Sequence, residues 1–94
     1  MQPLYKADST IKVIAEHYEQ IVEEETELME RIRTCEAYLN AILEQTYRNG
    51  DQHHKLTVED ILTAVFTISS ELRTELLHVQ FEKALLSCRM KQDK

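Results

Sequence analysis

The feature that most constrains this chain is an apolar spacing that alternates between three and four residues without a slip. No Gly or Pro interrupts the chain between Ser9 and Tyr47. The positions are Ile11, Ile14, Tyr18, Ile21, Glu25, Leu28, Ile32, Cys35, Leu39 and Ile42. Such a spacing forms the a and d positions of a heptad repeat, which turn one face of a helix toward a neighbouring helix. We therefore predict one helix over residues of about 9–48, about 60 Å long.

The opposite face of this predicted helix is acidic. Its f positions are Glu16, Glu23, Glu30, Ala37 and Glu44. Between Val13 and Glu30 the chain carries seven Glu and no Lys or Arg. We take Glu16, Glu23 and Glu30 as a candidate acidic face, because clustered carboxylates attract a basic partner surface.

The first helix is predicted to end near the chain's only glycine, within a turn over residues 49–56. Asn49 and Gly50 tolerate the left-handed geometry that often follows the last helical turn. Thr57 and Asp60 then have the spacing of a capping box at the start of a second helix. Two apolar residues flank this box at the spacing of a hydrophobic staple: Leu56 and Ile61. We therefore expect the second helix over residues of about 57–91.

The second helix repeats the spacing of the first, with polar interruptions at Ser69 and Lys83. Its seam is Leu62, Val65, Ser69, Leu72, Leu76, Val79, Lys83, Leu86 and Met90. A short turn favours an antiparallel neighbour, which brings Lys83, Arg89 and Lys91 beside the acidic run of the first helix. The expected fold class is all-α, a single helical-hairpin domain over residues 1–94. We expect a partner chain to complete it to a four-helix bundle or coiled-coil assembly.

Glu25 occupies a seam position where an aliphatic residue is expected. A buried carboxylate is costly unless it is paired. Two interpretations are possible, and we favour the first. Either the seam opens locally to water within the acidic run, or Glu25 meets Lys, Arg or His across an interface and sets the register.

The adjacent His53 and His54 of the turn could bind a transition metal through their imidazole rings. A structural zinc site needs about four ligands, however, and His17 and His78 lie far along the helices. We therefore expect a solvated turn, with no metal and no cofactor. The chain also has no Gly-rich phosphate loop and no nucleophile at a fixed spacing from a base, so we do not expect an enzyme.

The two cysteines are expected to stay reduced. Cys35 occupies a d position, where it acts as a small core residue, and the hairpin places Cys88 too far away for a disulfide. The N-terminal residues MQPLYKADST contain no apolar run. We therefore expect neither a signal peptide nor a membrane span, and a cytoplasmic protein. Secretion without a cleaved signal stays open.

The second helix carries a further apolar stripe, which we call the second stripe. Its residues are Leu77, Phe81, Ala84, Leu85 and Cys88. At about 100° per residue its centre lies roughly opposite the seam, and a helix that is apolar on two sides must be covered on two sides. Ile61, Phe66 and Ile68 broaden the apolar surface upstream. Leu4 and Tyr5 could fold over part of this surface, but we favour contact with another chain, with Phe66 included among the partner-binding residues.

The chain is therefore predicted to be a small acidic interaction module that self-associates or docks on an amphipathic helix of a protein partner. Its net charge of −6 disfavours nucleic acid as that partner, and mimicry of nucleic acid is a minor alternative. In size, acidity and architecture the chain resembles small all-helical chaperones, which implies an alternative role in masking an amphipathic helix of a secretion or assembly subunit. Its mid-chain turn resembles that of small helical hairpins exported as dimers, although their Trp-x-Gly turn is absent near Tyr47 and Gly50. A second alternative is a regulator whose acidic face occupies a basic site on an enzyme or transcription factor.

Overall fold

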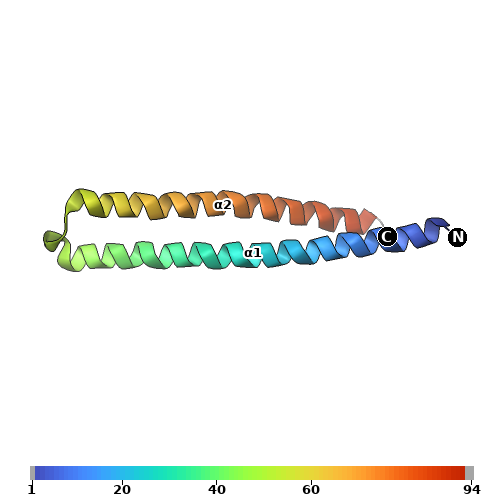
Figure 1. Ribbon diagram of the computed structural model, residues 1–94, viewed down its shortest axis with the longest axis horizontal. Helices are drawn as coiled ribbons and strands as arrows, with labels where there is room; N and C mark the ends of the chain where they lie inside the picture. The colour runs from blue at the N-terminus through green and yellow to red at the C-terminus, as the bar shows by residue number, and fades with distance from the viewer. Residues whose placement is uncertain (1, 93–94) are drawn as a thin grey trace.

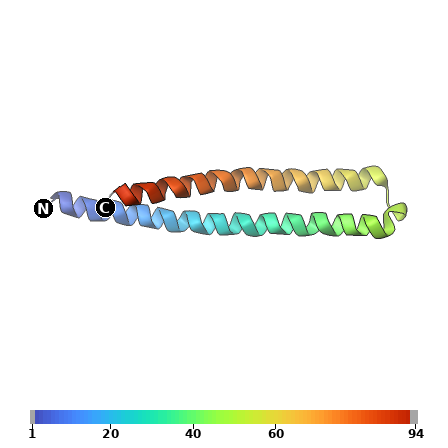
Figure 2. The same ribbon diagram turned by 180° about the vertical axis from the view of Figure 1, so that it is seen from behind.

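The protein is a long antiparallel helical hairpin, as the computed structural model shows for the backbone of residues 2–92 and the side chains of residues 10–92 (Figure 1). Helix α1 spans Gln2–Asn49, the short 3-10 helix η1 spans Gly50–Gln52, and helix α2 spans Lys55–Gln92. The two long helices lie side by side in both views, forming a rod with extents of 76 × 15 × 14 Å (Figures 1 and 2). The predicted all-α hairpin is confirmed, and the described residues contain no strand.

Helix α1 begins at Gln2 rather than near Ser9. Pro3 falls in the first helical turn, where the missing N–H of proline removes no intrahelical hydrogen bond. The N-terminal end of α1 projects past the end of α2 (Figure 1). The predicted alternative cover for the second stripe, Leu4 and Tyr5, lies outside the residues whose side chains the structure describes.

The first helix ends without the left-handed residue that the sequence suggested. Asn49 has φ −134° and ψ 26°, and Gly50 continues into η1. No residue of the described part of the chain has a positive φ. A Cβ on Gly50 would meet Cγ2 of Thr46 at 3.5 Å, an ordinary van der Waals contact. The glycine is therefore not required by the backbone of this turn.

Helix α2 begins earlier than the capping-box pattern predicted, and His54 caps it. The backbone N–H of Thr57 donates to Nδ1 of His54 at 3.3 Å, and the Thr57 hydroxyl lies 3.0 Å from the same nitrogen. The backbone N–H of Val58 donates to the His54 carbonyl at 3.1 Å, the first helical bond. The expected box of Thr57 and Asp60 is therefore wrong, because both residues already lie inside the helix. The expected staple is wrong as well, since Leu56 lies inside α2 instead of preceding its cap.

The core lies along the two predicted seams. Seven apolar side chains of the described residues are buried between the helices: Ile14, Ile21, Leu28, Ile32, Leu72, Val79 and Leu86. Tyr18, Cys35, Leu76 and Met90 pack against them while remaining partly exposed. This confirms Cys35 as a small residue of the seam, and both cysteines are free. One layer of seven side chains is a small core for the described residues 10–92, so this part of the hairpin hides little apolar surface by itself.

Candidate interaction surface

The two charged residues that interrupt the seams, Glu25 and Lys83, meet each other. Nζ of Lys83 donates to Oε1 of Glu25 at 2.7 Å, and Nε2 of Gln80 donates to Oε2 of the same carboxylate at 3.2 Å. The Glu25 side chain is only 14% exposed. The favoured interpretation of Glu25, a seam that opens to water, is therefore wrong. The alternative pairing with a cation across an interface is confirmed, and the interface is the one between α1 and α2.

This contact shifts the protonation of both partners. The hydrogen bond from Lys83 lowers the pKa of Glu25 below its ordinary value, although burial opposes that shift. The hydrogen bond to Glu25 raises the pKa of Lys83, against a smaller opposing effect of burial. Each group therefore stabilises the charged form of the other.

Two further contacts define the flanks of the hairpin on either side of the seam. On one flank Arg73 pairs with Glu36. On the other flank Nε2 of His17 lies 3.4 Å from Oε1 of Glu82, with both side chains about half exposed. Together with Glu25 and Lys83, these pairs fix which turn of α1 lies beside which turn of α2.

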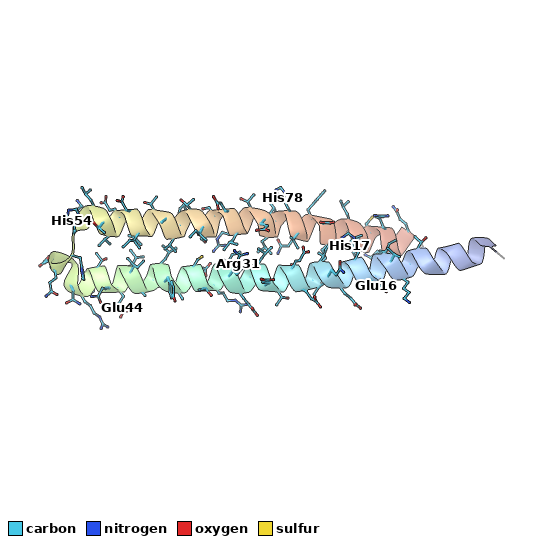
Figure 3. All side chains as sticks on the ribbon, viewed as in Figure 1. Glu16, His17, Arg31, Glu44, His54 and His78 are labelled. Carbon is cyan, nitrogen blue, oxygen red and sulfur yellow. The ribbon has the colours of Figure 1, made fainter. Side chains whose placement is uncertain are left out.

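The side of α2 that faces away from α1 is almost free of charge. In the heptad of α2 this outer face comprises the b, c and f positions between residues 63 and 88. The twelve residues are Thr63, Ala64, Thr67, Ser70, Glu71, Thr74, Leu77, His78, Phe81, Ala84, Leu85 and Cys88. All of them are exposed, and Glu71 alone carries a formal charge when His78 is neutral. Figure 3 shows His78 directed away from α1.

All five residues of the second stripe lie on this outer face. Phe81 and Leu77 are about two thirds exposed, and Leu85 is about half exposed. Ala84 and Cys88 are exposed beside them. The described side chains of α1 lie against the other side of α2, so nothing in the described part of the hairpin covers this face. A contiguous apolar patch on an elongated protein is typical of an interaction surface.

Phe66 lies apart from the second stripe, on the flank that carries Glu36 and Arg73. Leu43 comes seven residues after Glu36, and Phe66 comes seven residues before Arg73. Because the helices are antiparallel, these two positions lie side by side, one heptad nearer the turn than the ion pair. Both side chains are exposed. Phe66 is therefore placed on that flank, about 16 Å along the axis from Leu77. Ile61 and Ile68 lie on the opposite flank, where they are also exposed.

The predicted acidic face lies on the far side of the molecule. Glu16, Glu23 and Glu30 are all exposed, and none of them forms an ion pair among the described residues. Figure 3 shows Glu16 and Glu44 directed away from α2. The outer faces of the two helices thus differ. The outer face of α1 carries carboxylates, whereas that of α2 is uncharged except for Glu71.

The turn end of the hairpin holds both adjacent histidines in local hydrogen bonds. Nε2 of His53 lies 3.3 Å from Nε2 of Gln45, while the ring of His54 caps α2. No group of three or more His, Cys, Asp or Glu side chains in the described part of the chain is arranged to hold a metal ion. Gln45 and His53 line a shallow hollow with Ile42 and Val58. This hollow is open and mainly apolar.

Comparison with protein families, with curated proteins and with solved structures finds no match to this chain. Within the described residues, neither helix has a stretch long and apolar enough to cross a lipid bilayer.

The sequence interpretation missed half of the outer face of α2. Thr63, Thr67, Ser70 and Thr74 continue the spacing of Leu77 toward the turn. They are polar, so a search for apolar residues overlooks them. The signal that could have found them is the absence of charge, since 30% of the chain is charged.

Proposed function

We propose that this chain is a small, acidic helical interaction module of the cytoplasm that binds another helix through the outer face of α2. The observation that carries the proposal is that face itself: twelve exposed positions with a single formal charge, in a chain of which 30% is charged. Solvated helix faces normally alternate charged and polar residues, as the back of α1 does. The exposed thiol of Cys88 suits a reducing compartment.

The energetics of the hairpin support the same proposal. Among the side chains that the structure describes, only seven apolar ones are buried between α1 and α2. Large hydrophobic residues on the outer face, including Leu77, Phe81 and Leu85, remain exposed. Covering them gains about 25 cal/mol per Å² of apolar surface removed from water. A partner helix on this face therefore supplies the second half of a core that the hairpin alone lacks.

The test introduces one carboxylate on the outer face and a matched one elsewhere. Phe81→Asp places a charge at a side chain that is 65% exposed, and Val13→Asp makes a comparable change on the back of α1 at a side chain that is 63% exposed. The readout is the native mass of the tagged protein, measured both in an extract of its source cells and after purification. Phe81→Asp should release the chain from its assembly and leave its helical circular dichroism unchanged, while Val13→Asp should leave the assembly intact.

The result that overturns the proposal is an unmodified chain that runs as a monomer in both preparations. An assembly that Phe81→Asp leaves intact would overturn it as well. A one-to-one complex with a different protein, lost on Phe81→Asp, would support the proposal and identify the module as a chaperone or adaptor for an amphipathic helix.

A second candidate function is a regulator that binds a basic site through Glu16, Glu23 and Glu30. It is favoured by the exposure of these three carboxylates and by their lack of ion pairs among the described residues. Such binding would weaken steeply with salt, because exposed charges are screened over about 10 Å at 0.1 M ionic strength. It would also survive Phe81→Asp and be lost when the three glutamates are replaced by glutamine.

A further inference from the structure

We propose that the partner of the outer face of α2 is a second copy of this chain, bound antiparallel, with Leu85 of each copy meeting Leu85 of the other across a two-fold axis. This inference rests on the proposed function, because it names the occupant of the same surface. It is argued from the spacing, the side-chain sizes and the charges of α2.

The outer face contains a second heptad seam. Eight of its residues are spaced alternately four and three apart: Thr63, Thr67, Ser70, Thr74, Leu77, Phe81, Ala84 and Cys88. All eight are exposed and none carries a formal charge at neutral pH when the Cys88 thiol is protonated. The seam that packs α2 against α1 has the same alternation, so α2 has the pattern of a helix that packs against helices on two sides.

The apolar half of this outer seam is complementary to itself in antiparallel orientation. When the segment from Leu77 to Cys88 is laid on its own copy, Phe81 faces Ala84 of the second copy and Leu77 faces Cys88 of the second copy. Each large side chain then meets a smaller one, which is how the facing layers of a packed core interdigitate. Both pairs occur twice because a two-fold interface is made of the same patch on both subunits.

Leu85 lies beside this seam and meets its own copy. Within the hairpin, Glu36 and Arg73 each follow a seam residue by one position and pair across the flank. Leu85 likewise follows a seam residue, Ala84, by one position. In the antiparallel alignment of Phe81 with Ala84, the residue that lies across the flank from Leu85 is therefore Leu85 of the second copy. Every apolar residue of the second stripe thereby faces an apolar residue.

The charges of the chain favour this arrangement over a contact through α1. In the alignment Lys91 faces Thr74 of the second copy, Arg73 faces Ser87 and Gln80 faces its own copy, so no like charges meet. In this dimer the two α2 helices pack against each other in the centre, and the two α1 helices lie on the outer sides. The exposed glutamates of α1 then lie on the two outer sides of the pair, where the repulsion between two chains of net charge −6 is smaller than in a contact through α1.

The first test uses charge at Leu85, which is exposed in the hairpin and outside its core. Leu85→Glu alone and Leu85→Lys alone should each run as a single chain of 11.1 kDa by light scattering, because each variant places like charges together across the two-fold axis. An equimolar mixture of the two variants should recover a particle of twice that mass at low salt. A mixture that stays monomeric, while the unmodified protein is a dimer, overturns the two-fold contact at Leu85.

The second test reads the helix direction with thiols, in a Cys35→Ala background. In the antiparallel dimer the two copies of Cys88 are about 16 Å apart along the axis, too far for a disulfide. Leu77→Cys should therefore cross-link on mild oxidation when Cys88 is present and fail to do so with Cys88→Ser. Cross-linking through Cys88 alone would indicate parallel helices and overturn the arrangement.

The outcome for the purified, unmodified protein separates this inference from the proposed function. A monomer in dilute solution overturns the second copy as partner. If the same chain is held in a larger assembly in its source cells, and Phe81→Asp releases it, the interaction module stands with a different partner. A monomer in both settings overturns both proposals together.

Discussion

Glu25 and Lys83 meet 2.7 Å apart across the seam between α1 and α2, and each is the charged residue that interrupts its own apolar repeat. A shift of one heptad along the seam would separate Glu25 from Lys83 and put an apolar residue, Leu76 or Met90, in the place of the Lys83 ammonium. The pair therefore selects one register of the hairpin among several that the apolar spacing alone would allow.

Replacing one member of this pair should destabilise the hairpin, and replacing both should restore it. Glu25→Leu or Lys83→Leu leaves a partly buried charge without its partner, whereas the double variant leaves two apolar residues that can pack. We expect each single variant to melt several degrees below the unmodified protein, at about 4–8 °C for each kcal/mol lost, and the double variant to melt at or above it. Thermal unfolding by circular dichroism measures this coupling. Additive losses in the double variant would show that the two side chains act independently.

The same pair predicts how stability changes with pH. The pKa of Glu25 lies below its ordinary value of 4.5, chiefly because Lys83 donates to it. Its contribution is therefore fully present above about pH 4.5 and is lost as the pH falls through the lower value of the folded protein. We expect the difference in unfolding free energy between the unmodified protein and Glu25→Gln to shrink across that acid range in urea titrations. Glu24→Gln, which removes an exposed glutamate without an ion pair among the described residues, serves as the control.

Lys83 sets the alkaline limit of this stabilisation. Its pKa is raised above the ordinary 10.5 by the hydrogen bond to Glu25. A raised pKa contributes stability that is fully present below about pH 10.5 and is lost as the pH rises through the folded value. Lys83→Met should therefore differ most from the unmodified protein between these two limits. A difference that stays constant up to strongly alkaline pH would contradict the pairing.

The cap on α2 predicts that one of two adjacent histidines matters for stability. His54→Ala removes the acceptor for the Thr57 backbone N–H and should cost up to about 1 kcal/mol. His54→Asn supplies a good capping side chain and should retain or raise the stability. His53→Ala is the matched control, because the His53 ring contacts Gln45 and does not cap the helix. Urea unfolding of the three variants measures the order, and equal losses at both histidines would argue against the cap.

Gly50 should tolerate a side chain. Its φ is not positive, and the nearest atom to an added Cβ is a methyl group at 3.5 Å. Gly50→Ala should therefore leave the stability unchanged or raise it by about 0.4–1 kcal/mol, because alanine has less conformational freedom to lose on folding. A loss of more than about 1 kcal/mol in urea unfolding would indicate that the turn needs a left-handed residue after all.

The hairpin could be predicted from the sequence because the apolar spacing within each helix is enough to identify the face that is buried. The sequence identified Glu25 and Lys83 as interruptions but could not join them, since their pairing depends on the register between two helices. It placed the start of α2 wrongly because Thr57 and Asp60 satisfy a common pattern, whereas histidine is an uncommon cap. The exposed second stripe was predicted from the same periodicity, and its uncharged continuation toward the turn was not, because hydroxyl side chains are usually assigned to solvent.

The contrast between the core of the hairpin and the outer seam of α2 gives the last prediction. Ile21 is 2% exposed in the inner core, so Ile21→Ala should lower the unfolding free energy by about 2–5 kcal/mol at every protein concentration. Leu77 faces outward, so Leu77→Ala should leave the stability of the isolated hairpin nearly unchanged. It should instead flatten the dependence of the melting temperature on protein concentration, because a partner that binds the folded state stabilises it by mass action. Melting curves recorded over a hundredfold range of concentration separate the two effects. If Leu77→Ala lowers the melting temperature equally at all concentrations, Leu77 packs within its own hairpin, and the outer face of α2 loses its role as a surface for another chain.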